Sequence, residues 1–516
     1  MNAFETHGIK VAFRVDANAE IGLGHLMRCL ALADRLAAAG VCCHFLGYGD
    51  VVRTHVADRH VFHSLPDISA GRLDDVDAEG VQDYAHWLPY GWRADAAACL
   101  NVLADIGRVD WLIVDHYALD RRWEEMLVPV TVRLMVIDDL ANRDHACDLL
   151  LDQNLVDGMA TRYHLRVPAN CRQLLGPSYA LLRPEFAATR AAAQARPTLA
   201  GVNSILVMFG GADAVDLTSE TVAALRELAY AGSVNVVVGP LYANVATLRE
   251  SLAALPGAIL HVAPSGLANL IAGADFVVGS PGVSSWERCV LGAPAAVVTV
   301  ASNQAQIATA LARVGAHWHL GALGGDSFDA LKAALALALH SPDSLEGMRR
   351  HAFAVCDGLG TDRVVRHLAA LAITLRPATI EQAGILHAWR NDPRVRQASF
   401  NTSVIDFETH MRWIEQVLAD PQRHLLIAAT VDGDVAGVRF DCAGDEAEVS
   451  IYLAPDLGNR GLGTAVIKEM RHWARVNLPA VSRLTATVLA NNPSSRKAFL
   501  NAGFKPRHEV LTVDLR

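Results

Sequence analysis

Residues 14–33 have the sequence RVDANAEIGLGHLMRCLALA. The run that leads into them, from residue 9, has the apolar content of a buried strand, Gly22 and Gly24 allow a tight turn, and residues 25–39 repeat apolar side chains at helical spacing. The pattern predicts a strand, a glycine loop and a helix with His25 on its first turn. First-turn amides and the helix dipole favour bound anions and disfavour a cationic imidazole. A neutral His25 facing a phosphorylated substrate is one interpretation, and a solvated histidine at an ordinary turn is the other.

Apolar strands alternate with helical runs along most of the chain. A first series of strands is expected at 11–15, 41–46, 111–115, 134–138 and 149–152. A second series is expected at 204–209, 233–238, 259–262, 276–279 and 295–299. Such alternation is typical of parallel sheets with helices on both faces. The sequence therefore predicts two α/β domains of the nucleotide-binding type, with a ligand cleft at the carboxyl ends of their strands.

Changes in composition divide the 516 residues into three expected domains. The first covers residues 1–185 and the second residues 186–372, with a linker near the Ala/Arg-rich stretch 190–197. Helical sequence at 327–371 completes the second domain or packs back on the first. From residue 373 onward, a strand, amphipathic helices, several strands and a glycine-rich turn before another helix predict an α+β domain, 373–516.

Composition also excludes several classes of protein. No apolar run reaches the length of about 18 residues that a membrane span needs, and the N-terminus lacks a basic region followed by an apolar one. We therefore expect a cytoplasmic protein with no membrane partner. The nine cysteines have no C-x-x-C or zinc-site spacing, which predicts neither disulfides nor structural zinc. A net charge of −10 argues against a nucleic acid partner.

Glycines and a helix start in the second domain favour nucleotide binding. Gly210 and Gly211 follow a predicted strand, so backbone amides there can approach a phosphate closely. The stretch GSPGVSS, which ends in Ser284 and Ser285, leads into a helix and forms a second anion-binding helix start. Glu287, in the first turn of that helix, suits the two hydroxyls of a ribose, although an acid there also suits the helix dipole alone.

Several motifs in combination resemble the UDP-sugar hydrolases of pseudaminic acid biosynthesis, over nearly all of residues 8–345. They are R-x-D-x(5)-G-x-G-H-x-x-R-C-L-x-L-A from Arg14, VDHY at 114–117, IDDL at 137–140, LGPSYALLR at 175–183, MFGGAD at 208–213, and the Glu287 helix followed by SNQ at 302–304. The resemblance implies a GT-B fold of two Rossmann-like domains that gives the sugar to water and not to an acceptor sugar. The implied substrate is UDP-2,4-diacetamido-2,4,6-trideoxy-β-L-altropyranose, released as free sugar and UDP with inversion at the anomeric carbon.

The resemblance also implies roles for residues of these motifs. His25 matches the catalytic histidine that orients or deprotonates the attacking water, Tyr117 and Asn303 match active-site positions at the sugar or diphosphate, and Glu287 matches the ribose-binding glutamate. From the residues alone we infer that Asp16 orients His25 or binds the sugar. The other residues expected at the substrate are Arg14, Gly24, Arg28, Gly210, Gly211, Ser284, Ser285 and Gln304.

The chemistry of UDP release agrees with these roles. UDP is a good leaving group, so the protein mainly has to position one water and stabilise charge on the diphosphate with amides. A second carboxylic acid, as in ordinary glycosidases, is not needed. The pair Asp138-Asp139 is expected to cap a strand end, and no metal is expected.

The third domain carries two motifs in the order and spacing of GNAT acetyltransferases, which use acetyl-CoA. SIYLAPDLGNRGLGTAV at 450–466 predicts a strand, a glycine-rich turn that cradles a pyrophosphate, and a helix. NNPSSRKAFLNAGF at 491–504 predicts a helix that ends in Gly-Phe. The residues expected at acetyl-CoA are Leu453, Asn459, Arg460, Gly461, Gly463, Thr464 and Asn492.

A narrower resemblance lies upstream, in WRNDP at 389–393 and IDFETHMRWI at 405–414. These segments look like the GNAT enzyme of the same pathway, which acetylates the 4-amino group of UDP-4-amino-4,6-dideoxy-N-acetyl-β-L-altrosamine. Two residues depart from the pattern: Gly458 replaces the usual Gln or Arg, and Phe499 replaces the tyrosine that protonates the departing thiolate. Glu448 is a candidate base through water or a solvent-facing strand acid.

Both halves of the chain then point to successive steps on one nucleotide sugar, and a bifunctional acetyltransferase and hydrolase is the interpretation we favour. One alternative is a GT-B glycosyltransferase fused to a GNAT domain that acts on another amino sugar. In a second alternative, the GNAT domain acetylates protein N-termini. In a third, the chain is a regulator that binds a UDP-sugar and has an inactive GNAT domain. The oligomeric state, the acyl group and the sugar stereochemistry stay open.

Overall fold

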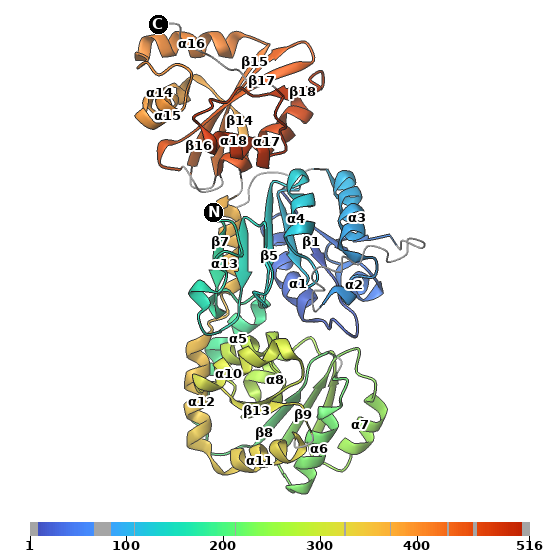
Figure 1. Ribbon diagram of the computed structural model, residues 1–516. Helices are drawn as coiled ribbons and strands as arrows, with labels where there is room; N and C mark the ends of the chain where they lie inside the picture. The colour runs from blue at the N-terminus through green and yellow to red at the C-terminus, as the bar shows by residue number, and fades with distance from the viewer. Residues whose placement is uncertain are drawn as a thin grey trace.

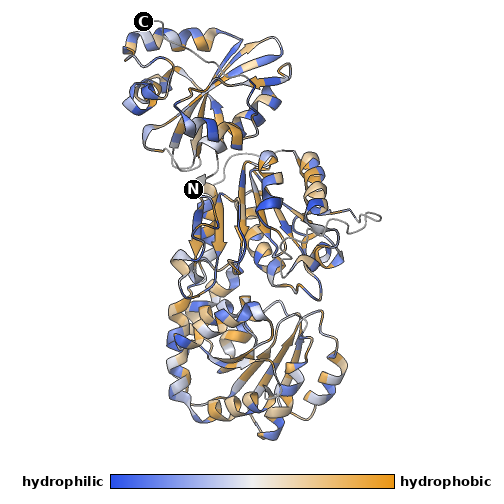
Figure 2. Ribbon diagram, viewed as in Figure 1, coloured by the Kyte–Doolittle hydropathy of each residue, from blue (hydrophilic) through white to orange (hydrophobic). Residues whose placement is uncertain are grey.

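The computed structural model describes residues 9–66, 84–107, 109–211, 213–324, 327–371, 373–430, 433–457 and 462–507. Its architecture consists of three sheets that follow one another along the chain (Figure 1). Apolar residues gather in the strands and on the helix faces that cover them (Figure 2). Within the described ranges, no helix is long and apolar enough to cross a membrane.

The first sheet has seven strands, each parallel to its neighbours, in the order β3-β2-β1-β4-β5-β6-β7. They are β1 (Lys10–Val15), β2 (Cys42–Gly47), β3 (Val61–Ser64), β4 (Trp111–Asp115), β5 (Arg133–Ile137), β6 (Leu149–Asp152) and β7 (Arg172–Leu175). One face packs against α1 (Gly24–Ala37) and α2 (Asp50–Val56), and the other against α3 (Gly91–Ile106) and α4 (Arg121–Leu127). The predicted parallel sheet with helices on both faces is confirmed. The edge strands β3 and β7 were not among the predicted strands.

The second sheet has six parallel strands in the order β10-β9-β8-β11-β12-β13. They are β8 (Ser204–Met208), β9 (Ser233–Val238), β10 (Ala258–Val262), β11 (Phe276–Gly279), β12 (Ala295–Thr299) and β13 (Trp318–Ala322). One face is covered by α6 (Leu217–Glu227), α7 (Val245–Leu252) and α11 (Ser327–His340). The other is covered by α5 (Pro184–Gln194), α8 (Leu267–Gly273), α9 (Val283–Leu291) and α10 (Ala305–Arg313). Two such parallel sheets are the GT-B architecture that the sequence predicts.

The chain crosses between the first two domains at two adjacent places. It leaves the first domain through η4 (Pro177–Tyr179) into α5, and returns from α12 (Pro342–Val355) into α13 (Gly360–Leu371). The two crossings are joined by Thr361, whose hydroxyl accepts from the amide of Leu182 at 2.9 Å and donates to its carbonyl at 2.8 Å. Val364 and Leu368 of α13 are buried in the core of the first domain beside α1. The helical sequence at 327–371 is thus divided, with α11 on the second sheet and α13 on the first.

The third sheet is antiparallel except at its last pair, in the order β14-β15-β16-β17-β18. Its strands are β14 (Thr374–Pro377), β15 (Arg423–Thr430), β16 (Gly433–Ala443), β17 (Glu446–Leu453) and β18 (Arg483–Thr485). One face packs against α17 (Leu462–Asn477) and α18 (Pro493–Asn501), and the other against α14 (Ala383–Asn391) and α16 (Phe407–Ala419). β17 pairs with the parallel β18 only from Glu446 to Glu448 and runs on to Leu453, so the two strands part beyond Glu448.

Short elements complete the described chain. They are α15 (Pro393–Gln397) and the 3-10 turns η1 (Ala85–Trp87), η2 (Val128–Val130), η3 (Met159–Thr161), η5 (Ser302–Gln304), η6 (Ile380–Gln382) and η7 (Pro455–Leu457). Of these, η1 and η5 contribute side chains to the first site, and η2 lies beside α3.

Candidate functional sites

A cleft of about 640 Å³ lies between the first and second domains. It is lined by the ends of strands and the starts of helices in both, where ligands bind in parallel α/β sheets. Ten of the residues expected at the substrate line it: Gly24, His25, Arg28, Tyr117, Gly210, Gly211, Ser284, Glu287, Asn303 and Gln304. The structure therefore brings together side chains that lie nearly 280 positions apart in the sequence, at 25 and 303.

His25, the second residue of α1, is held by a carboxylate at the end of β4. Its Nδ1 lies 2.6 Å from Oδ1 of Asp115, and because a carboxylate only accepts, Nδ1 carries the proton in this contact. Arg28, one turn further along α1, donates from Nε to the other oxygen of Asp115 at 2.6 Å. Burial alone would raise the pKa of Asp115, but Arg28 and His25 hold it well below its usual range. Asp115 thus stays ionised and fixes the orientation of the His25 ring through Nδ1.

Tyr117 and Asn303 meet across the cleft. Nδ2 of Asn303, in η5 of the second domain, donates to the phenol oxygen of Tyr117 at 3.4 Å. The Tyr117 hydroxyl donates to Asp139 at 2.7 Å. Asp139 also forms an ion pair with Nη1 of Arg28 at 2.7 Å and accepts from the side-chain amide of Asn154 at 2.8 Å. Burial and the charge of Asp139 raise the pKa of Tyr117 well above its usual range. Tyr117 is therefore a neutral hydroxyl in a fixed position at the cleft wall.

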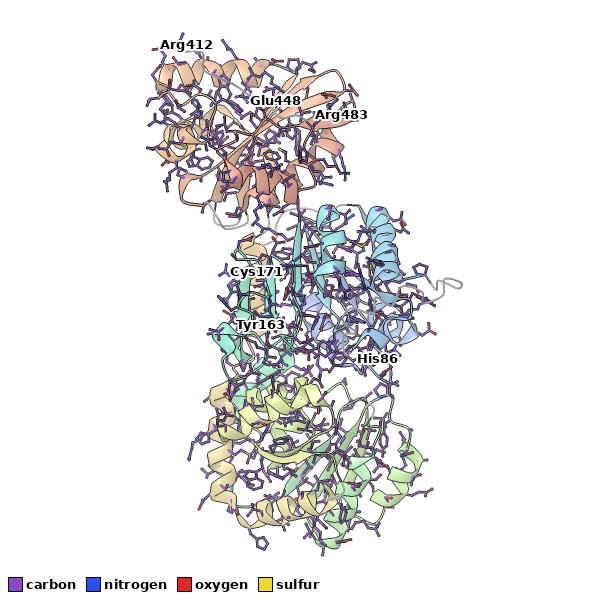
Figure 3. All side chains as sticks on the ribbon, viewed as in Figure 1. His86, Tyr163, Cys171, Arg412, Glu448 and Arg483 are labelled. Atoms are coloured by element: carbon purple, nitrogen blue, oxygen red, sulfur yellow. The ribbon has the colours of Figure 1, made fainter. Side chains whose placement is uncertain are left out.

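An aromatic wall stands beside His25 in the first domain. Trp87 of η1 stacks on Tyr117 with ring centroids 5.2 Å apart, and its edge contacts His25 at 5.8 Å. Tyr84 contacts both Trp87 and Tyr117, at 4.9 and 5.0 Å. His86, at the end of the first domain that faces the second (Figure 3), pairs through Nε2 with Glu20 of the glycine loop at 2.9 Å. This wall was not predicted from the sequence.

Arg14 and Asp16 were expected at the substrate, but they lie behind the cleft. Arg14 is fully buried, and its Nη2 lies 2.6 Å from Asp95 and 2.8 Å from Asp16. Asp16 accepts from the backbone amide of Tyr48 at 2.8 Å. Side chains alternate along a strand, so residues 14 and 16 point to the α3 face whereas α1 covers the opposite face. The prediction that Asp16 orients His25 is wrong: Asp115 holds that position.

The second domain lines the cleft with the turn after β8 and with the start of α9. Gly210 has a φ of 95°, which favours glycine, and a Cβ on Gly211 would lie 3.3 Å from the Leu23 side chain across the cleft. Ser284 lines the cleft at the start of α9. Ser285 does not: its hydroxyl oxygen accepts from the amide of Gly282 at 3.3 Å and caps the helix. The expected substrate contact of Ser285 is therefore replaced by a capping role.

Glu287 lines the cleft one turn into α9, with a side chain that is 12% exposed. Burial raises its pKa to about 7, against the opposing charges of Arg183 and Arg288. Nη2 of Arg183 lies 3.9 Å from Oε1 of Glu287, beyond hydrogen-bond distance. A buried carboxylate that gains hydroxyl donors from a ligand is stabilised in its ionised form.

The third domain places Glu448 where β17 and β18 part (Figure 3). Glu448 is exposed and accepts from the Thr487 hydroxyl at 2.9 Å. Leu453 ends β17 and would touch a Cβ on Gly463 of α17 at 3.7 Å, and Thr464 lies in the first turn of that helix. Asn492 caps α18 by accepting from the amide of Ser495 at 3.0 Å. Asn459, Arg460 and Gly461, together with Gly458, lie outside the described residues.

Asp138 and Asp139 both have side-chain partners. Asp138 lies 2.7 Å from Nη1 of Arg143 and accepts from Tyr163 at 2.9 Å, whereas Asp139 belongs to the Tyr117 cluster. Among the residues that the structure describes, no group of three or more His, Cys, Asp or Glu side chains is arranged to hold a metal.

Sequence reasoning missed two carboxylates that hold the cleft residues His25 and Tyr117, although each lies in a motif already noted. Asp115 is part of VDHY and Asp139 is part of IDDL. The signal that could have found them is strand parity: Trp111 and Ile113 of β4 face α1, so Asp115 faces α1 as well.

Comparisons with known proteins find different relatives for the GNAT domain and for part of the rest of the chain. Residues 372–505 match the acetyltransferase (GNAT) domain family. An uncharacterized protein of Methanocaldococcus jannaschii is 20% identical over 514 residues, which cover 96% of this chain and 97% of that protein. The UDP-2,4-diacetamido-2,4,6-trideoxy-beta-L-altropyranose hydrolase of Campylobacter jejuni is 29% identical over 179 residues, 34% of this chain and about half, 53%, of that enzyme.

Among solved structures, the crystal structure of Acinetobacter baumannii MurG is similar at 15% identity and a TM-score of 0.49, over 70% of this chain and 99% of that protein. The first two domains thus combine a partial sequence similarity to a UDP-sugar hydrolase with a cleft between parallel sheets. Residues 372–505 are an acetyltransferase domain of the GNAT family.

Proposed function

We propose that the chain is a bifunctional nucleotide-sugar enzyme of pseudaminic acid biosynthesis. In this proposal the cleft hydrolyses UDP-2,4-diacetamido-2,4,6-trideoxy-β-L-altropyranose, and the GNAT domain makes that substrate by acetylating UDP-4-amino-4,6-dideoxy-N-acetyl-β-L-altrosamine. The observation that carries the hydrolase half is the contact of His25 with the ionised Asp115 at the wall of the cleft. The similarity to the Campylobacter jejuni hydrolase supports the choice of sugar.

The hydrolytic step follows from the orientation of His25. Asp115 holds the proton on Nδ1, so Nε2 accepts a proton from water as the water oxygen attacks the anomeric carbon. The bond from that carbon to the UDP oxygen breaks, and its electron pair leaves with UDP. Amides of the Gly210-Gly211 turn and the start of α9 are positioned to stabilise the diphosphate, and Glu287 to accept from the ribose hydroxyls.

Water is favoured over a sugar acceptor because of the aromatic wall. Tyr84 and Trp87 lie on the side of His25 that belongs to the first domain, and both contact Tyr117. An acceptor sugar that approached His25 from this side would have to displace these rings, whereas a water would not.

The GNAT domain uses acetyl-CoA as its co-substrate, by analogy with its family. Glu448 lies at the point where β17 and β18 part and is positioned to take a proton from the substrate ammonium through water. The freed amine attacks the thioester carbonyl, the carbon–sulfur bond breaks, and CoA leaves as the thiolate. The nitrogen loses a second proton as the amide forms, and because Phe499 has no hydroxyl, water carries that proton to the thiolate.

The test is incubation with UDP-4-amino-4,6-dideoxy-N-acetyl-β-L-altrosamine, with and without acetyl-CoA, and identification of products by mass and NMR. With acetyl-CoA we expect the free diacetamido sugar and UDP, and without it neither. His25→Asn should stop at the acetylated UDP-sugar, with sugar release lowered at least about a hundredfold, the low end for a lost general base. Release of UDP only when an acceptor sugar is added would favour the glycosyltransferase, and acetylation of peptides but not the amino sugar would favour a protein acetyltransferase.

A further inference from the structure

A second cavity, separate from both sites above, lies between the first domain and the GNAT domain. Its volume is about 380 Å³, within the range of small-molecule sites. One wall is apolar and comes from α3 and the segment around η2, including Leu103, Ala104 and Val130. The other wall is a single helix, α17 of the GNAT domain, which Figure 1 shows on the side of that domain nearest the first.

The α17 wall is entirely basic at its polar positions. Lys468, Arg471, His472 and Arg475 line the cavity, and their spacing of three, four and seven residues places them on one helix face. Lys468 is only 8% exposed, and its Nζ lies 3.4 Å from the carbonyl oxygen of Val132 in the first domain. Among the described residues, no carboxylate lines the cavity.

Like charges gather on this face, although Lys468 donates to the carbonyl of Val132 and Arg471 to the carbonyl of Ala502. Burial, together with the charges of Arg133 and Arg471, lowers the pKa of Lys468 to about 8 against the attraction of Asp148. Asp148 already accepts from the amide of Leu134 at 2.9 Å and from Arg133 at 3.3 Å. Cations gathered on one helix face repel one another, and an anion bound between them offsets that repulsion.

We propose that this cavity binds an organic phosphate of the nucleotide type, with its aromatic or apolar part against α3 and η2 and its phosphate on the basic face of α17. The site goes beyond the two proposed activities, since none of its residues lines the cleft or the strands around Glu448. Because its walls belong to two domains, a bound ligand stabilises the contact between them.

Pyridoxal 5′-phosphate is a direct probe of this proposal, because it joins an aromatic ring, a phosphate and an aldehyde. The neutral amine of Lys468 adds to the aldehyde carbon, water leaves, and borohydride supplies hydride to the imine carbon to give a stable secondary amine. Peptide mass mapping then resolves the modified lysine. The lysines of the chain are Lys10, Lys332, Lys468, Lys497 and Lys505, so the others serve as internal references.

We expect Lys468 to be modified with a rate that saturates as the probe concentration rises, and pyridoxal without its phosphate to label it far more slowly. A lowered pKa alone would speed the reaction without saturation, so saturation reports binding. Arg475→Ala removes an exposed cation of the site and should lower the labelling of Lys468 about tenfold, the effect of one charge-assisted hydrogen bond.

Ala104→Trp fills the cavity from the opposite wall and should block labelling, whereas Ala97→Trp, exposed on the same helix but outside the cavity, should leave it unchanged. Protection by UDP or by CoA would identify which kind of nucleotide fits, and protection by inorganic pyrophosphate alone would support the phosphate contact. Labelling of Lys468 that does not saturate, or that is equal in Arg475→Ala, Ala104→Trp and the unsubstituted protein, would overturn the proposal.

Discussion

Nδ1 of His25 lies 2.6 Å from Oδ1 of Asp115, and the two residues come from neighbouring parts of one sheet, the helix after β1 and the end of β4. The contact fixes the orientation of the histidine that we propose as the base. It also assigns the carboxylate role to a residue of β4 and removes it from Asp16 of the glycine loop.

Replacing that carboxylate should affect turnover more than binding. Asp115→Asn keeps the shape of the side chain but no longer stabilises a protonated imidazole, so sugar release should fall at least about a hundredfold. UDP affinity, measured by calorimetry, should change little, since Asp115 does not line the cleft. Asp16→Asn is the matched control, with an expected loss below about tenfold. Equal losses in the two variants would contradict the assignment.

UDP affinity should depend on pH through Glu287. Burial raises the pKa of Glu287 to about 7, and ribose hydroxyls donate to the ionised form, so affinity should rise with pH and level off above about 7. Between about pH 6 and about pH 8 the gain should be about tenfold. Glu287→Gln should bind UDP more weakly and lose this part of the dependence, while titration of the UDP phosphate itself stays common to both proteins.

The raised pKa of Glu287 also makes the stability of the folded protein depend on pH. The folded protein holds the Glu287 proton between its ordinary pKa of 4.5 and about 7, where the unfolded chain has released it. Stability therefore falls as the pH rises through this window, and Glu287→Gln should remove that slope in denaturant unfolding.

Trp87→Ala should allow a nucleophile other than water to attack the UDP-sugar. The substitution opens the space beside His25 and Tyr117, so a small alcohol such as glycerol can reach the position of the attacking water. The oxygen of the alcohol then bonds to the anomeric carbon, its proton passes to His25, and UDP leaves as before. Mass spectrometry should detect the glycoside in Trp87→Ala and not in the unsubstituted enzyme. Free sugar as the sole product of a fully active variant would show that the wall does not select water.

Glu448 and Glu446 offer a matched pair in the GNAT domain. Both belong to β17 and point to the same face, but Glu446 forms an ion pair with Arg483, whereas Glu448 accepts from Thr487. Glu448→Gln should lower acetylation at least about a hundredfold near neutral pH, with partial recovery at high pH as the substrate amine loses its proton unaided. Glu446→Gln should acetylate normally. A pH profile unaltered by Glu448→Gln would return Glu448 to a surface role.

Fragments should separate the two activities, with α13 as the decisive segment. Residues 1–372 keep α13 on α1 and should hydrolyse the diacetylated UDP-sugar without acetyl-CoA, while residues 370–516 should acetylate the amino sugar alone. A fragment that ends at Val355 loses Val364 and Leu368 from the first core and should unfold at a lower temperature by calorimetry. A folded 1–372 fragment that regains hydrolysis only when the GNAT domain is added would show that the sites are not independent.

In the first sheet the central strands were predictable because they are apolar and regularly spaced, whereas the edge strands β3 and β7 were not. In the second sheet the edge strand β10 was predicted and the edge strand β13 was not. β7 has two exposed residues among four, and β3 has none that is buried, so neither has the apolar run of a central strand. The glycine loops, His25 and Glu287 were found from local motifs. The contact with Asp115, the wall of Tyr84 and Trp87, and the basic face that α17 presents to another domain depend on which elements pack together, and local patterns do not carry that information.

The paired crossings at Leu182 and Thr361 have a mechanical consequence. The two chain segments that connect the lobes are hydrogen-bonded to each other. A rotation of one lobe about either segment alone would break these bonds. These bonds thereby restrict the relative orientation of the lobes in which Asn303 meets Tyr117 across the cleft. The geometry of the cleft that we propose for the UDP-sugar thus depends on a joint made by one threonine side chain and one leucine backbone.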